Sequence, residues 1–488
     1  MNDPEFAPIV SDQEASAHID LYALTHKDIQ DPPTSLLKAM TKIGPGLILA
    51  ASIVGTGELI ATTALGAKQG FVLLWLILVS CVIKVFVQVE MGRYAITRGK
   101  TSLGAIDTLP GPRLGTSWLA WLWLLMMLAT NGQLAAMEGL VGEAAVMVFH
   151  GDDVIKAQGY TDSVPFWATM TCFAAIALLL SGGYKRLEKI TTVLVALVTL
   201  VTVLGAMRLP MSFGQVASGL RFSLPSGGEG LFLAFATFGI TGVGASELFA
   251  YPYWCIEKGY ARAAGPRSDN DDWARRARGW VRVMQLDAWF SMIVFTLATV
   301  AFYFMGAAAL NGKLTTGAIG LEDLKGANMI RTLAHMYVEV LGAWARPFFL
   351  LGAWAILFKT LYVATAANSR MTADFLRLGG FLPDRGSLGR ERTVKVFCVI
   401  YPLLSLAIFL AFREPLQLIA IGGAAQGLML PLIAGATLYL RYRDADPRVG
   451  PSKLSDILSW LAFLGIASVA SYTIYGWGAS LLKVLGLR

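Results

Sequence analysis

Apolar stretches of about 20 residues recur along the whole chain, and they constrain its fold more than any other feature. A helix of that length crosses roughly 30 Å of hydrocarbon. In a bilayer every backbone polar group needs a partner within the protein, and these stretches lack the alternation of a barrel strand. The pattern therefore predicts an all-α polytopic membrane protein. The composition agrees, because 15% of the 488 residues are charged, against about 25% in soluble domains.

The chain divides into a tail, two groups of five spans and one additional span. Residues 1–43 form a predicted cytosolic tail, 44–207 and 230–440 the two five-helix groups, and 456–482 the additional helix. With about eleven spans expected, the predicted positions are 44–68, 70–92, 115–149, 165–182, 188–207, 230–257, 283–309, 338–368, 394–412, 415–440 and 456–482.

Basic residues indicate which side of the membrane the loops face. Lys185 and Arg186, and the cluster around Arg275, lie in loops on the same side as the N-terminal tail. The positive-inside rule then predicts a multi-pass protein of the inner or plasma membrane with a cytoplasmic N-terminus. The net charge of +7 follows from these loops. The charge therefore does not imply a nucleic-acid partner, and the apolar spans make the lipid bilayer the expected partner.

The chemistry-bearing residues argue against an enzyme. The cysteines form no CxxC pair and lie in apolar segments, which predicts neither disulfides nor a thiolate metal site. We find no nucleophile with an adjacent base, no phosphate-binding loop and no metal-ligand histidine pair. No resident cofactor is expected, although a transported cation is compatible with the residues described below.

Two spans share a glycine-rich motif centred on a glutamate. Residues 54–61 read Val-Gly-Thr-Gly-Glu-Leu-Ile-Ala, and residues 243–250 read Val-Gly-Ala-Ser-Glu-Leu-Phe-Ala. Because the motifs fall in the first and sixth spans, each repeat contains five spans, and an odd number inverts the second repeat relative to the first. Many secondary transporters are built from inverted repeats whose interrupted helices form the substrate site.

The glycines in these motifs predict that helices 1 and 6 are interrupted. Each glycine disfavours helix by up to about 1 kcal/mol relative to alanine, and unwound backbone at membrane depth is tolerated where it lines a cavity. Thr56 and Ser246 are expected to cap the second half-helices. The predicted substrate-binding residues are Gly55, Thr56, Gly57, Glu58, Gly244, Ser246 and Glu247.

Two carboxylates near the membrane midplane need compensation, since each charge costs roughly 2.5–3.5 kcal/mol there. Glu58 and Glu247 could ligate a hard divalent cation such as Mg²⁺ or Mn²⁺. One of them could instead be protonated, because two close carboxylates do not both ionise easily. A third interpretation pairs them with the membrane lysines Lys84 and Lys359. The sequence leaves these alternatives open.

Other ionisable residues suggest a coupling pathway. Glu138 in the third span is a candidate step on a proton path. Lys84 and Lys359 are candidates for ion coupling, because an ammonium can replace a coupling cation, or for fixed ion pairs. Asp287 at the start of the seventh span is expected to form an interfacial salt bridge with neighbouring arginines.

The order and spacing of several short motifs resemble the Nramp divalent-metal transporters, which have the LeuT-type fold. The resemblance implies a 5+5 inverted repeat over spans one to ten. The residues that carry it are residues 44–46 (Gly-Pro-Gly), Gly66, Ala67, Gly70, residues 73–75 (Leu-Leu-Trp), Gln88, residues 367–370 (Ala-Asn-Ser-Arg) and residues 430–431 (Leu-Pro).

The binding motifs depart from that family. Nramp proteins carry Asp-Pro-Gly-Asn where residues 55–58 read Gly-Thr-Gly-Glu, and Met-Pro-His where residues 244–246 read Gly-Ala-Ser. The family's second histidine in the sixth helix falls on Tyr251, its glutamine in the tenth span on Gly423, and its two acids in the third span on Ala135 and Glu138. Loss of the methionine removes a soft ligand, so the remaining donors are expected to be oxygens that favour a harder ion.

These observations lead to one main hypothesis and two rivals. The main hypothesis is proton-coupled uptake of a divalent cation, with Glu58 and Glu247 as ligands and Glu138 on the proton path. The first rival keeps the transporter architecture but moves a small organic amine or amino acid. The second is a receptor or sensor that keeps the fold without transport.

Overall fold

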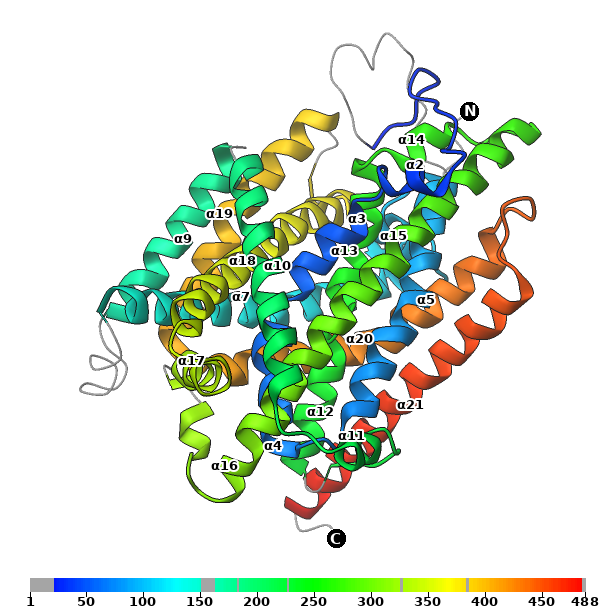
Figure 1. The fold of residues 1–488 in the computed structure, drawn as a ribbon. Helices are drawn as coiled ribbons and strands as arrows, with labels where there is room; N and C mark the ends of the chain where they lie inside the picture. Colours follow the sequence, from blue (N-terminus) through cyan, green and yellow to red (C-terminus); the bar gives the residue numbers. More distant parts are fainter. Residues whose placement is uncertain are drawn as a thin grey trace.

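The computed structural model describes residues 22–150, 163–181, 184–225, 228–324, 328–382 and 386–484. These residues are almost entirely helical (Figure 1). Among them, nine helices are long and apolar enough to cross a membrane, or ten if a bent pair is counted as one span. The bent pair is α10 (Tyr184–Arg208) with α11 (Phe213–Gly219). The predicted all-α membrane architecture is confirmed.

The long helices follow the predicted spans. They are α5 (Leu74–Arg98), α7 (Trp118–His150), α9 (Ser163–Ser181), α15 (Asp271–Phe304), α18 (Ala345–Leu378), α19 (Gly386–Phe412), α20 (Pro415–Asp444) and α21 (Lys453–Val484). Shorter elements connect them: α2 (Leu36–Met40), α6 (Ser102–Ile106), the hairpin of β1 (Arg113–Leu114) and β2 (Thr116–Ser117), α14 (Tyr260–Ala264), η2 (Met305–Leu310), α16 (Asn311–Thr315), η3 (Leu321–Leu324) and α17 (Asn328–Leu341).

The helices of the seventh and ninth spans begin earlier than predicted, at Asp271 and Gly386, and the predicted start of the eighth span is wrong. The eighth span was expected over 338–368, but residue 338 belongs to α17, and α18 begins at Ala345 and runs to Leu378. Gly342 has a φ of 98° between the two helices. That backbone conformation ends an α-helix and is readily adopted only by glycine.

The first helix is interrupted at the predicted motif. It comprises α3 (Pro45–Ile53), the π-helical segment η1 (Thr56–Thr62) and α4 (Thr63–Gln69). Val54 and Gly55 leave the helical conformation, with φ/ψ of −68°/66° and −135°/−131°. The cap of η1 is Gly55 rather than the predicted Thr56, because glycine adopts this backbone without a Cβ clash. The Thr56 side chain lies outside the described part of the structure.

The sixth helix is interrupted between α12 (Gly228–Ile240) and α13 (Ala245–Glu257). Residues 241–244 are not helical, and Gly242 has a φ of 67°. Gly244 is the N-cap of α13, so the predicted cap Ser246 lies inside the first turn. Both predicted interruptions are confirmed, whereas both predicted caps are displaced onto glycines.

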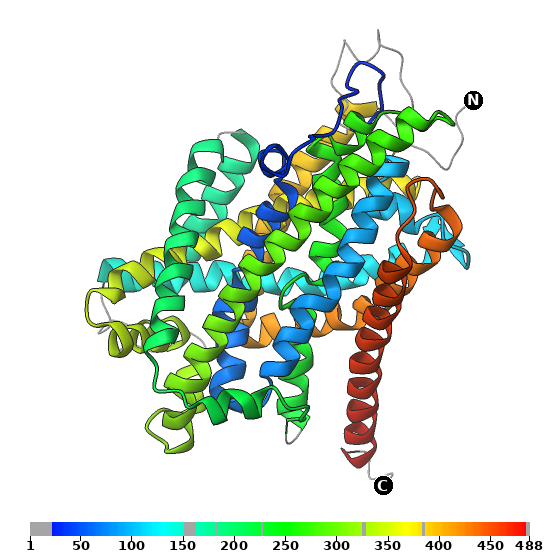
Figure 2. The same cartoon turned by 45° about the vertical axis from the view of Figure 1, so that its right-hand side comes forward.

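The two broken helices lie inside a shell of long helices. α20 packs against α7 and α12, α18 packs against α7 and α3, and α15 packs against α5 and η1. α21 lies on the outside against α20 and α5, where Figure 2 shows it running along the bundle. α2 and α14 lie at one end of the bundle, and α11 and α16 at the opposite end (Figure 1). The breaks therefore lie in the interior, between these two ends.

Candidate functional site

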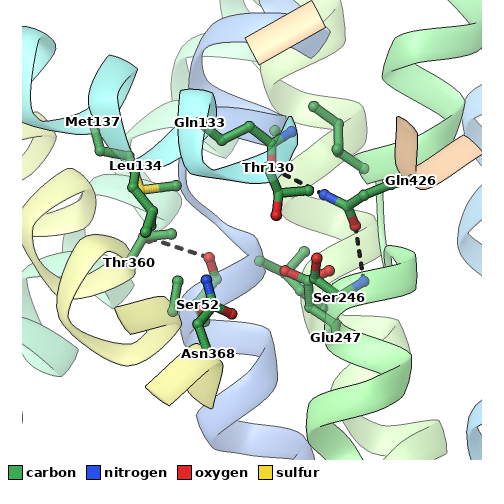
Figure 3. Close-up of a pocket in the computed structure, with 14 residues that line it drawn as sticks. Ser52, Thr130, Gln133, Leu134, Met137, Ser246, Glu247, Thr360, Asn368 and Gln426 are labelled. Atoms are coloured by element: carbon green, nitrogen blue, oxygen red, sulfur yellow. Dashed lines mark hydrogen bonds between the residues drawn. The ribbon is translucent and has the colours of Figure 1, made fainter. Parts of the chain in front are cut away.

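A polar cavity of about 50 Å³ lies between the two broken helices and α7, α18 and α20. Figure 3 shows Glu247 and Ser246 on one side of it, with Ser52, Thr360 and Asn368 opposite. A single water needs roughly 10–15 Å³ by this measure, so the cavity has room for an ion and a few waters. Its lining comprises Ser52, Ile53, Gly57, Thr130, Gln133, Leu134, Met137, Ile240, Ser246, Glu247, Thr360, Ala364, Asn368 and Gln426.

Glu247 supplies the carboxylate in this lining. It belongs to the first turn of α13, where the helix dipole favours negative charge. Its Oε2 is buried and has no hydrogen-bond partner among the described residues. A carboxylate that faces a polar cavity with an unused oxygen is available to bind a cation.

Two glutamines fix the α13 end of the cavity. Gln426 of α20 accepts a hydrogen bond from the Ser246 backbone N–H at 3.0 Å, and its Nε2 donates to Gln133 Oε1 at 2.9 Å. Gln133 in turn donates to the Ile419 carbonyl at 3.3 Å. These bonds link α7, α13 and α20 at the break, and they satisfy one of the free N–H groups of α13.

Glu58 does not line the cavity, although its neighbour Gly57 does. It is fully buried, and its Oε1 accepts hydrogen bonds from the Gly242 backbone N–H at 3.1 Å and from Thr299 Oγ1 at 3.2 Å. Glu58 therefore ties the break in the first helix directly to the break in the sixth and to α15. The two repeat glutamates do not converge on one cavity.

Lys84 donates its hydrogen bonds to a helix end and not to a glutamate. Its Nζ donates to the carbonyls of Phe238 and Thr241, at 2.5 and 2.7 Å, where α12 ends. The last carbonyls of a helix lack intrahelical partners and carry the negative end of its dipole. Among the described residues no ion pair joins Lys84 to Glu58 or Glu247. The Lys84 ammonium group thus contacts the unwound carbonyls at the end of α12, where a bound cation would otherwise lie.

The wall opposite Glu247 is formed by the end of α3 and by α18. Thr360 Oγ1 donates to the Ser52 carbonyl at 3.1 Å, next to the break (Figure 3). A Cβ atom on Gly55 would meet Thr360, which explains why this position is glycine. Lys359 is buried beside Thr360 in α18 and is not among the described lining residues.

Glu138 lies outside the cavity, one residue beyond the lining residue Met137. It is fully buried near Ser405 of α19 and Cys172 of α9, and neither carboxylate oxygen has a geometrically acceptable hydrogen-bond partner among the described residues. A buried carboxylate in these surroundings is a position where a proton can be held.

The expectation for Asp287 is wrong. Its side chain is fully buried and accepts hydrogen bonds from the backbone N–H groups of Gly44 and Gly46, at 2.9 and 2.5 Å. Tyr251 donates to the same carboxylate at 3.3 Å. Asp287 therefore satisfies the start of α3 instead of forming a salt bridge with the arginines, because free N–H groups at a helix start attract a carboxylate.

Of the fourteen described lining residues, only Gly57, Ser246 and Glu247 were predicted from the sequence as site residues. Gln426, Met137 and Asn368 are among the eleven that were not. Gln426 lies one helical turn beyond Gly423, the position expected for the family's glutamine. Gly423 packs so closely on α12 that a Cβ would lie 2.5 Å from the Ala236 carbonyl oxygen, which leaves no room for a side chain. The sequence signal that could have identified Gln426 is a polar residue in a membrane helix, one turn beyond the aligned position. Met137 also places a thioether sulfur in the lining. The atoms there that could bind a metal are therefore not all oxygens, contrary to the expectation from the sequence.

Among the described residues no group of three or more His, Cys, Asp or Glu side chains could hold a metal ion. A cation in the cavity would therefore bind one carboxylate, with hydroxyl, amide and carbonyl oxygens and water completing its shell. Such a shell is typical of hard cations, which often keep several waters.

Two helices broken at inverted repeat motifs, facing a polar cavity, define a secondary transporter of the LeuT-type fold. Residues 46–476 match the family model "Natural resistance-associated macrophage protein-like", Nramp, so the chain belongs to that family. Its members are membrane transporters and not enzymes. The resemblance inferred from the short motifs is confirmed.

Relatives and solved structures agree over most of the chain. An uncharacterised protein of Pasteurella multocida is 24% identical, covering 93% of this chain and 95% of the relative. "Divalent metal cation transporter MntH 1" of Pseudomonas aeruginosa is 25% identical, covering 91% and 93%. A manganese transporter structure from Eremococcus coleocola superimposes with a TM-score of 0.61 at 17% identity, covering 92% and 90%. MhsT in complex with L-phenylalanine gives 0.54 at 15% identity, covering 90% and 100%. These two structures support the fold alone.

Proposed function

We propose that this protein transports a divalent metal cation, partly hydrated, through the cavity beside Glu247. The observation that carries the proposal is the Glu247 carboxylate, which lines a cavity of ion size and has one oxygen without a hydrogen-bond partner among the described residues. The family and the similarity to proteins named MntH add support. The basic loops favour an N-terminus in the cytoplasm of the cell, with the protein in the inner or plasma membrane.

The test is uptake of Mn²⁺ and Mg²⁺ into proteoliposomes. Glu247→Gln keeps the shape of the side chain but removes its charge, and a hydrogen bond or contact with a charged group contributes about 1.5–3 kcal/mol. We expect uptake at subsaturating metal to fall by at least about tenfold. Glu229→Gln is the matched control, because Glu229 is exposed and pairs with Lys68 far from the cavity. Equal uptake by Glu247→Gln and the native protein would exclude Glu247 as a ligand.

Proton coupling is the second part of the proposal, with Glu138 as the proton carrier. Its burial without a hydrogen-bond partner among the described residues, next to the lining residue Met137, supports that role. In Glu138→Gln we expect metal binding to persist, while an inward acid gradient no longer accelerates uptake. Uptake measured with and without a pH gradient checks this, with Glu229→Gln as control. Acceleration retained by Glu138→Gln would assign the proton to another group.

The organic-substrate alternative fits the cavity less well. Pockets for organic ligands usually enclose about 300–1,000 Å³, against about 50 Å³ here. The Ser246 N–H that could receive a substrate carboxylate already donates to Gln426. An amine could still pair with Glu247. A larger rise in melting temperature with small amines than with Mn²⁺ or Mg²⁺ would favour this alternative, since a ligand specific for the folded state stabilises it.

A further inference from the structure

A second, larger cavity lies at the end of the bundle that carries α2 and α14. Its volume is about 290 Å³, and it is bounded by the N-terminal segment, the residue after the α2 cap, the start of α14 and one turn of α15. The residues that matter for its chemistry are Asp28, Lys42, Lys258, Tyr260, Arg262 and Trp280. None of them belongs to the transport cavity described above.

The lining carries three cations and one carboxylate. Asp28 lies 3.7 Å from Arg262, and its Oδ2 also accepts a hydrogen bond from Thr25 at 2.8 Å. The Arg262 Nε is buried without a hydrogen-bond partner in the described part of the chain. Neither Lys42 nor Lys258 has a carboxylate at ion-pair distance among the described residues. The side chains that line the cavity therefore carry an excess of two positive charges and unused donors, which favours an anionic ligand. Asp287, outside the lining, interacts electrostatically with Lys258 and offsets part of this excess.

The walls of this cavity are held in place by hydrogen bonds and stacking. The Trp280 indole donates to the Gln30 carbonyl at 3.0 Å, and its ring stacks on Tyr260 with centroids 5.7 Å apart. Tyr260 Oη donates to the Lys42 carbonyl at 2.9 Å. These contacts fix the backbone around the cations before any ligand binds. A site organised in advance loses less conformational entropy on binding.

The neighbouring helix α2 indicates where the cavity lies relative to the membrane. Leu36 and Leu37 of α2 are 70% and 81% exposed, although they are large apolar side chains. Such residues on a short helix at the end of a membrane bundle are expected to lie in the bilayer interface. The cations of the cavity therefore face the depth at which lipid phosphates lie.

We propose that this cavity binds the phosphate group of an anionic phospholipid. Basic pockets on the cytoplasmic side of membrane helices bind such headgroups. The ligand would contact Lys42, three residues before α3, and Lys258, the residue that follows α13. Bound lipid would thus connect the outer ends of the two half-helices that flank the transport cavity. The proposal does not depend on the identity of the transported substrate.

The experiment measures lipid binding by the full chain in phosphatidylcholine micelles, with short-chain phosphatidylglycerol as the probe. A triple variant removes the cavity charges: Lys42→Gln, Lys258→Gln and Arg262→Gln. The matched control removes three exposed charges outside the cavity, Lys38→Gln, Arg282→Gln and Lys453→Gln. A cation near an anionic lipid surface contributes about fivefold to binding. We therefore expect phosphatidylglycerol to bind the cavity variant on the order of 100-fold more weakly than the native protein, and the control variant within about threefold.

The outcomes separate the possible sources of the phosphate. Native-like melting of both variants in phosphatidylcholine alone would show that they are folded. Equal loss of phosphatidylglycerol binding in the cavity and control variants would overturn the proposal, because general surface charge would then explain the affinity. Inorganic phosphate that binds the cavity as tightly as phosphatidylglycerol does would overturn the lipid assignment in favour of a soluble phosphate. Strong preference for phosphatidylglycerol, lost in the cavity variant alone, supports it.

Discussion

The two repeat glutamates occupy equivalent places in sequence but different environments in the structure. Glu58 is buried and joins the two breaks through the Gly242 amide and Thr299. Glu247 is partly exposed and faces the transport cavity. One carboxylate therefore connects parts of the protein to each other, while the other is available to a substrate.

The local winding of the two helices accounts for this divergence. After the first break the chain winds as the π-helix η1, whereas after the second break it winds as the α-helix α13. A π-turn contains more residues than an α-turn, so side chains at equivalent positions point in different directions. An internal repeat thus identifies the two breaks, but packing decides which glutamate meets the substrate.

The largest expected effect is a difference in stability between the alanine variants of the two glutamates. Glu58→Ala would leave the buried Gly242 N–H without its acceptor and would open a cavity, at a cost of about 2–4 kcal/mol, while the Thr299 hydroxyl would keep its hydrogen bond to the Phe295 carbonyl. Glu247→Ala removes a side chain that faces polar space, so we expect less than about 1 kcal/mol. Melting temperatures of the two purified variants in detergent check this comparison.

Glu58→Gln is the control for the loss of charge. Its side-chain oxygen can still accept from Gly242 and Thr299, so the melting temperature should stay close to that of the native protein. If Glu247→Ala destabilised the protein as much as Glu58→Ala, the assignment of a structural role to Glu58 alone would be wrong.

The next largest effect is expected for a substitution of Gly242, the residue in the second break whose N–H donates to Glu58. Gly242→Ala places a Cβ on a residue with φ of 67° and 3.1 Å from the Cys81 Cα. The left-handed conformation costs a non-glycine residue roughly 1–2 kcal/mol. We expect a corresponding fall in melting temperature and slower metal uptake, because the amide that binds Glu58 would shift.

Gly312→Ala provides the matched control for that substitution. A Cβ on Gly312, in the helix α16, would meet no atom of the described residues within 4 Å. Alanine should therefore stabilise this turn slightly, by up to about 1 kcal/mol. A native melting temperature for Gly242→Ala would mean that the second break tolerates another backbone conformation.

The positions of the breaks could be predicted from sequence because glycine clusters act locally. The glycines within residues 54–61 and 243–250 themselves disfavour a helix, and the structure places both interruptions there. The lining of the cavity could not be predicted in the same way. It combines side chains from α3, α7, α12, α13, α18 and α20, and which face of each helix points inward depends on packing.

Gln426 shows why alignment with the family was insufficient. The aligned position, Gly423, lies at a close crossing of α12 and α20, where a Cβ would approach the Ala236 carbonyl. Since no side chain fits there, the polar group reaches the cavity from one turn away. Asp287 is a similar case, because its partners are backbone N–H groups of α3 that become neighbours only after folding.

The smallest expected effect concerns the choice between metals. Met137 provides the only thioether among the described lining residues, and soft ligands favour Mn²⁺ over Mg²⁺. Met137→Leu conserves volume and should cost less than about 1.5 kcal/mol of stability. We expect the ratio of Mn²⁺ to Mg²⁺ uptake, measured in competition, to fall by about threefold to tenfold. Met126→Leu is the control, because Met126 is buried in the same helix but does not line the cavity. An unchanged ratio in Met137→Leu would leave the oxygen donors around Glu247 as the sole determinants of selectivity, and would sharpen the contrast with Glu58 further.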